Sequence, residues 1–123
     1  MLGLKSHMNF YLCHGSVDMR KGIVSLSELV RRTMNASPEN GDVFIFLGKD
    51  RRNLKILRHE SNGYVLYWKK LDRELFLLPV FNTDTDRYEI SWDKLVVLLQ
   101  GTVRKELLGH LQKPVFSQIS LRV

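Results

Sequence analysis

The chain has 123 residues, of which 44% are hydrophobic and 26% charged, so it fits one folded domain and is not disordered throughout. Nineteen Lys and Arg residues outnumber 13 Asp and Glu, and the net charge of +6 favours a polyanionic partner. One cysteine, Cys13, excludes an intrachain disulfide and a multi-cysteine zinc site, and no apolar stretch approaches the ~18 residues of a membrane span. We therefore expect a cytoplasmic protein that does not bind membranes.

The first third of the chain predicts a strand and a helix. Residues 9–13 form a short apolar run typical of a strand, and Ser16 or Asp18 can cap a helix over 18–34. Apolar residues recur there at helical spacing, namely Met19, Ile23, Leu26, Val30 and Met34. Residues 35–42 contain Pro and Gly and predict a loop.

The middle of the chain predicts an antiparallel meander. Its apolar and aromatic runs are separated by short polar segments, and Asn62-Gly63 is a favoured pair for a tight hairpin turn. Pro79 places the last strand at an edge or shortens it. The expected strands are 43–47, 54–59, 64–70 and 75–80.

The last third predicts a polar loop, a helix and a tail. Residues 81–89 are polar, Ser91 can cap a helix over 92–100, and the helix is expected to end at Gly101. The tail, 102–123, can begin as a helix and breaks at Pro114. The predicted fold is α+β, an antiparallel meander of four or five strands with two or three helices packed on one face. We expect one domain over 1–123, with 102–123 as an extension.

The sequence carries no pattern of a catalytic or metal site. The four histidines are far apart, and there is neither a glycine-rich phosphate loop nor a nucleophile motif. Asp84 and Asp86 are close enough to suggest a nuclease, but acidic residues before a helix also stabilise its N-terminus. We therefore expect a protein without enzymatic activity, cofactor or metal.

The strongest feature is a concentration of positive charge. Residues 49–73 contain eight cations against three anions, with Tyr64, Tyr67 and Trp68 among them. Cations neutralise phosphates and aromatic rings stack on unpaired bases, so a shared surface of the hairpins would suit DNA. The alternative is a solvated face whose charges prevent aggregation. The candidate DNA-binding residues are Arg51, Arg52, Lys55, Arg58, Lys69 and Lys70, with Arg20 and Lys21 as a second patch.

Arg20 and Lys21 are expected in the first helical turn, where cations oppose the helix dipole. Such a local conflict suggests a functional requirement. The alternative is that one of these cations pairs with Asp18 or with the acidic segment 84–93.

Several segments together resemble one known family. These are Asn9-Phe10-Tyr11-Leu12, Asp18-Met19-Arg20-Lys21-Gly22, Leu54-Lys55-Ile56-Leu57 and the run from Gly63 to Leu71. In this order and spacing they resemble the small TnpB-type accessory proteins of insertion-sequence-66 elements, over residues 9–101. The resemblance implies an accessory role in transposition, with catalysis carried by a separate transposase. It carries over no catalytic residues.

Two functional hypotheses follow. In the first, the protein binds the DNA of the transposon ends through its basic sheet surface. In the second, it is an adaptor that docks on the transposase through the edge of the strand Tyr64–Trp68, the helix residues Leu95–Leu99 or the tail Val115–Val123. Other element-encoded proteins and a second copy of the chain are further expected partners.

Overall fold

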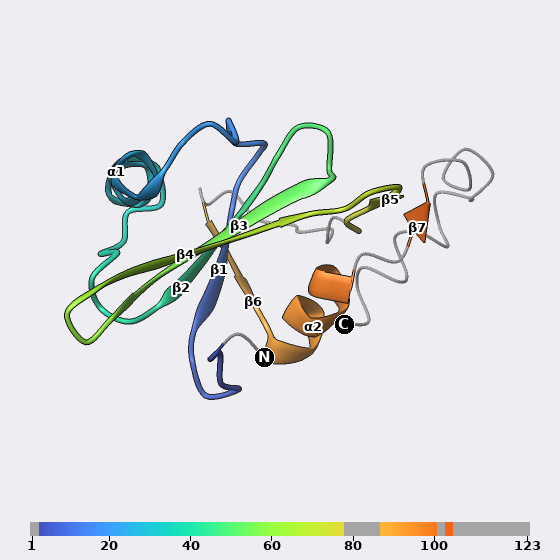
Figure 1. Cartoon of the computed structure of the whole chain (residues 1–123). Coiled ribbons are helices and arrows are strands. Elements are labelled where there is room, and N and C mark those ends of the chain that lie inside the picture. Colours follow the sequence, from blue (N-terminus) through green and yellow to red (C-terminus); the bar gives the residue numbers. More distant parts are fainter. Residues whose placement is uncertain (1–2, 78–86, 101–102, 105–123) are drawn as a thin grey trace.

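The computed structural model describes residues 3–77, 87–100 and 103–104 (Figure 1). The helices in this part are α1 (Ile23–Thr33) and α2 (Trp92–Gln100). The strands are β1 (Phe10–Cys13), β2 (Val43–Leu47), β3 (Asn53–Glu60), β4 (Gly63–Lys70), β5 (Glu74–Leu75), β6 (Arg87–Ile90) and β7 (Val103–Arg104).

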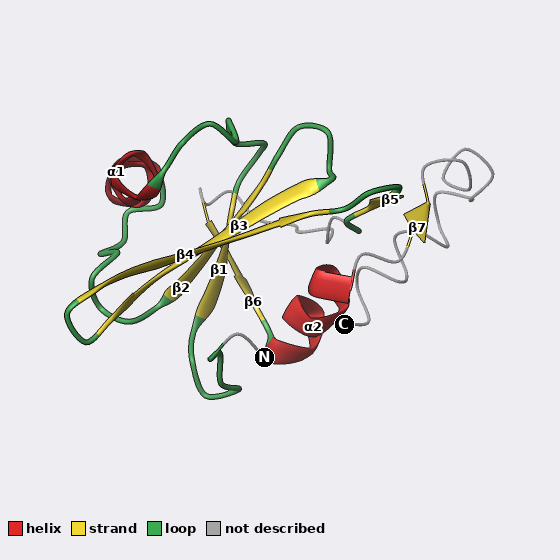
Figure 2. Ribbon diagram, in the orientation of Figure 1, coloured by secondary structure: helices red, strands yellow, loops and turns green. Residues whose placement is uncertain are grey.

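Five strands form one mixed sheet in the order β4-β3-β2-β1-β6 (Figure 2). The antiparallel pairing of β2, β3 and β4 confirms the predicted meander for this part of the chain. The meander does not extend to β1, which runs parallel to β2, because the connection through α1 returns the chain in the same direction. β6 pairs antiparallel with β1, and β5 and β7 form a separate two-stranded sheet. The α+β class is thus confirmed.

The two helices lie on opposite faces of the sheet, so the expectation that they share one face is wrong (Figure 1). The cause is β2, which is buried along its whole length. Its Val43, Ile45 and Leu47 belong to the apolar cluster that includes α2, whereas Phe44 and Phe46 belong to the cluster that includes α1. Since a strand alternates its side chains, a fully apolar strand needs a cover on both faces.

Helix α1 begins five residues later than predicted. Its N-cap is Gly22, which makes no side-chain cap, and Asp18 lies outside the helix. Instead, the segment before α1 lies beside the end of β2, where the backbone N–H of Val17 donates to the carbonyl of Leu47 at 2.8 Å. The apolar stripe is confirmed, because Leu26, Val30 and Met34 are buried.

Several boundaries were only partly predictable. The sequence predicts a polar loop over 81–89, whereas the structure places β6 from Arg87 to Ile90. A strand of only four residues shows too little periodicity to be recognised from its sequence. The β3–β4 hairpin pairs Glu60 with Gly63, so its loop is Ser61-Asn62, with positive φ at Ser61. β5 covers only the start of the strand predicted at 75–80. Residues 78–86, 101–102 and 105–123 lie outside the described part, and so do the predictions made for them.

α2 matches its prediction at its start. The Ser91 hydroxyl accepts from the backbone N–H of Lys94 at 3.2 Å, as an N-cap does. Neither α1 nor α2 has the length and apolar character needed to cross a membrane.

Candidate nucleic-acid interface

A buried lysine, Lys55, lies at the centre of the candidate interface. It is on β3 and only 4% exposed. Its ammonium Nζ donates to the backbone carbonyls of Met19 and Lys21, each at 2.7 Å. Charged hydrogen bonds of this length are strong, and a buried ammonium requires them. Lys55 thus fixes the segment 18–22 to the sheet.

Trp68 faces Lys55 from the neighbouring strand. The two residues are direct partners in the β3–β4 register, and Lys55 Nζ lies 4.4 Å from the centroid of the indole ring. The indole Nε1 donates to Asn53 Oδ1 at 2.9 Å, and Asn53 Nδ2 donates to Asp50 Oδ2 at 3.0 Å. Asn53 therefore holds the edge of the ring and Lys55 lies over one of its faces, yet Trp68 is 56% exposed.

The segment 18–21 presents its cations outward. The Asp18 carboxylate accepts the backbone N–H of Arg20 at 2.9 Å and pairs with its guanidinium at 2.7 Å. The Lys21 N–H closes the turn on the carbonyl of Asp18 at 3.1 Å. The side chain of Arg20 is 91% exposed, and Lys21 is half-buried. The predicted pairing of Arg20 with Asp18 is confirmed, whereas a position in the first turn of α1 is wrong.

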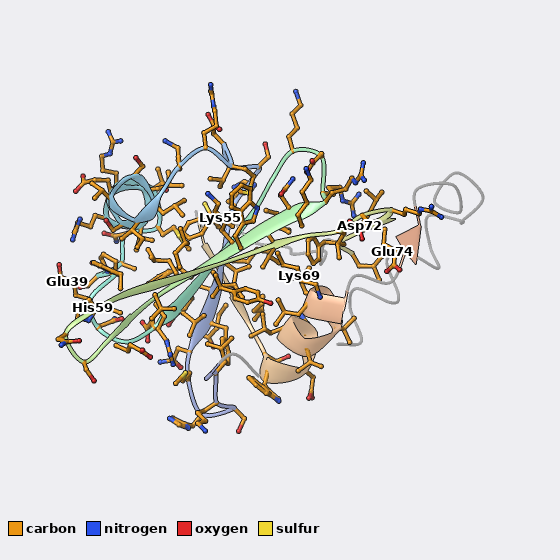
Figure 3. All side chains as sticks on the ribbon, in the orientation of Figure 1. Glu39, Lys55, His59, Lys69, Asp72 and Glu74 are labelled. Atoms are coloured by element: carbon orange, nitrogen blue, oxygen red, sulfur yellow. The ribbon has the colours of Figure 1, made fainter. Side chains whose placement is uncertain are left out.

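The six cations predicted to share one surface of the hairpins do not lie on one face of the sheet. Side chains alternate along a strand, so Lys55 and Lys70 lie on the α1 side of the sheet, while Arg58 and Lys69 lie on the α2 side. Figure 3 shows Lys55 and Lys69 on opposite sides of β3 and β4. The sequence spacing alone predicts this division, because two residues an odd number of positions apart on one strand point to opposite faces of the sheet.

Besides Lys55 and Arg20, four of the predicted cations contact the protein itself. Lys69 Nζ donates to the Leu99 carbonyl of α2 at 2.7 Å, and Arg51 Nη2 to that of Phe76 at 3.3 Å. Arg52 donates to the carbonyl of Asp72. Arg58 donates to the carbonyl of Gly3 at 3.0 Å and pairs with Glu60. These contacts join separate segments of the fold.

The segment that carries Arg20 and Lys21 lies on the same side of the sheet as Trp68 and Lys70, because Lys55 contacts both the indole and the backbone carbonyl of Lys21. Lys70 is exposed and lies two residues beyond Trp68 on the same face of β4. The backbone of Lys21 lies on this side of the sheet, because its carbonyl accepts a hydrogen bond from Lys55. We call Arg20, Lys21, Trp68 and Lys70 the Trp68 surface. What the sequence interpretation missed is that Lys55 is its buried support and not a contact.

A family model for IS66 Orf2-like proteins matches residues 8–107. The chain belongs to this family. Among curated proteins, it is similar to the uncharacterized protein y4hO of Sinorhizobium fredii, at 31% identity over 82% of this chain and 86% of that protein. It is also similar to y4jC of the same organism, at 29% identity over 64% and 68%. No solved structure matches.

Membership of the IS66 Orf2-like family makes the protein an insertion-sequence-associated accessory protein. The matched range contains the whole Trp68 surface and its support, Lys55. Within the described residues, no group of three or more His, Cys, Asp or Glu side chains could hold a metal ion. Asp84 and Asp86, on which a nuclease would depend, lie outside the described residues.

Asp18 and Lys21 also line a pocket of about 300 Å³ in this IS66 Orf2-like protein. It lies between the end of β1 and α1, with Cys13 and Leu29 among its apolar residues and His14, Asp18 and Lys21 among its polar ones. Cys13 itself is buried.

The Asp18 carboxyl is expected to titrate abnormally. Its hydrogen bonds with Arg20, first through the guanidinium and then through the backbone, hold its pKa well below the ordinary 3.8. Because the pKa of Asp18 is lower in the folded state, the ionised carboxylate stabilises the folded turn at pH values above the ordinary pKa. This stabilisation is lost as the pH falls through the lowered pKa. Carboxyl NMR should give an Asp18 midpoint below that of a free aspartate. In Arg20→Gln the midpoint should return toward the free value, and an unchanged midpoint would contradict the pairing.

Proposed function

We propose that this accessory protein supports transposition by binding DNA through the Trp68 surface. The observation that carries the proposal is that the side of the sheet with the exposed indole also carries Lys70 and the segment with Arg20 and Lys21, which Lys55 holds beside the ring. Arg, Lys and aromatic side chains are the groups that contact phosphates and bases.

The electrostatics of this surface favour an anion. Asp18 neutralises part of the charge of Arg20 but contacts only its Nε and Nη2 atoms. Lys55 adds a further positive charge directly beneath the surface. Its burial prevents contact with DNA, but a charge in a poorly solvated position is screened less than one in water.

The test is the salt dependence of DNA affinity for the parent chain and the variant Arg20→Gln, Lys21→Gln, Lys70→Gln. Each phosphate contact on a duplex contributes about −0.9 to the slope of log K against log salt. Three contacts therefore predict a slope of about −3 for the parent chain. The slope of the triple variant should be close to zero.

Lys5→Gln is the matched control, because it also removes an exposed cation, next to Leu4 in the cluster that includes α2. Its slope should equal that of the parent. An equal slope in parent and triple variant, or a salt-independent affinity, would refute binding through this surface.

A second candidate function is an adaptor that docks on the transposase. The observation that favours it is the edge position of β4, which pairs only with β3 in the described sheet. An edge strand of eight residues can accept a strand from another protein. A complex with the transposase that survives nuclease digestion, and that the triple charge variant retains, would support the adaptor.

A further inference from the structure

Trp68 is unusual among the side chains of the described part. The exposed large hydrophobic residues there are Val24, Val65 and Trp68, of which only Trp68 is aromatic. The indole belongs to neither apolar cluster. Its indole combines a large apolar face with a polar N–H group, a combination that is common at binding sites.

The position of α1 leaves this ring uncovered. Tyr64 and Leu66 lie on the same face of β4 and pack with the cluster that includes α1. Trp68 lies beyond them along the strand and is 56% exposed. The half of this face that carries Trp68 and Lys70 is thus open, although the adjoining half is packed.

The ring is also fixed before any ligand binds. The hydrogen bond from Nε1 to Asn53 sets its edge, and the Lys55 ammonium lies 4.4 Å from its centroid. Asn53 is buried and is itself held by Asp50. A ring held in this way loses little conformational entropy when a ligand stacks on it.

We propose that the ligand of the Trp68 surface is single-stranded DNA, with one unpaired base stacked on the indole of Trp68. This inference rests on the proposed function and specifies its substrate. In a duplex both faces of each base are covered by neighbouring bases, whereas a single strand exposes them. Arg20, Lys21 and Lys70 would then contact the phosphates on either side of the stacked base.

The experiment uses Trp68 as its own reporter. The chain contains two tryptophans, and Trp92→Phe leaves Trp68 alone, with an aromatic ring retained against Phe10. Stacking of thymine bases should quench the fluorescence of Trp68 when an oligothymidylate is added. A duplex of the same length should quench it less and bind more weakly at the same salt concentration.

Two substitutions then separate stacking from charge, with a cooperative urea-unfolding transition in each variant as the folding check. Trp68→Ala should weaken binding of the single strand by about 5- to 150-fold, the range for loss of one stacked base. Trp68→Phe keeps an aromatic face and should retain most of the affinity.

Each outcome bears on one of the two proposals. If Trp68→Ala leaves the affinity for single strands unchanged, or weakens duplex binding equally, stacking is refuted. The charge variant can still confirm DNA binding in that case. If the parent chain binds neither form of DNA, both proposals are overturned.

Discussion

Lys55→Met is expected to lower the free energy of unfolding by about 3 kcal/mol, because it removes two charged hydrogen bonds and leaves their acceptors unpaired. Methionine replaces most of the side-chain volume, so the loss reports on the ammonium contacts with Met19 and Lys21. Urea unfolding measures the change. The amide protons of residues 19–21 should also exchange faster with solvent, because the two hydrogen bonds that hold the segment to β3 are lost.

Lys70→Met is the matched control for this effect. It makes the same chemical change on the same face of the sheet, but at an exposed position. Its free energy of unfolding should stay within about 0.5 kcal/mol of the parent value. Both variants should weaken DNA binding, Lys70→Met by losing a contact and Lys55→Met by releasing the segment with Arg20 and Lys21. Equal stability of the two variants would contradict the supporting role of Lys55.

Phe44→Ala is expected to cost about 3–5 kcal/mol, the usual loss for removing a buried phenylalanine. Phe44 is fully buried on the central strand β2, lies opposite Leu57 in the register and stacks on Tyr11 with ring centroids 5.8 Å apart. Because a domain is stable by only about 5–15 kcal/mol, this substitution removes much of the total. Thermal and urea unfolding measure it.

Val24→Ala provides the comparison, because Val24 lies on α1 but is 77% exposed. The change should be within about 0.5 kcal/mol, since no cavity forms and alanine favours a helix. A loss below about 1 kcal/mol in Phe44→Ala would mean that the face of β2 under α1 is not part of the core.

Both core clusters meet at β2, which is buried along its whole length. Apolar side chains on either face of the strand anchor α1 and α2 independently. The open half of the α1 side is therefore not needed for the core. Trp68 and Lys70 lie in this open half, where their exposed side chains are available for the proposed binding of DNA.

Local pattern was sufficient for the elements that depend on near neighbours. The apolar run of β2, the alternation and turn that define β3 and β4, and the cap and spacing of α2 all follow from a few adjacent residues. The site was partly predictable in the same way. Strand period separates Lys55 from Arg58, and composition marks the cations and aromatics of the hairpin.

Tertiary structure decided the rest, because the deciding contacts join distant parts of the chain. The direction of β1 depends on its pairing with β2 across α1, and β6 becomes a strand only beside β1. Lys55 is buried because the segment 18–22, more than 30 residues earlier, supplies the carbonyls that bind it. An isolated lysine in a strand predicts a solvated charge, and only the partner that covers it makes it a support for Arg20 and Lys21.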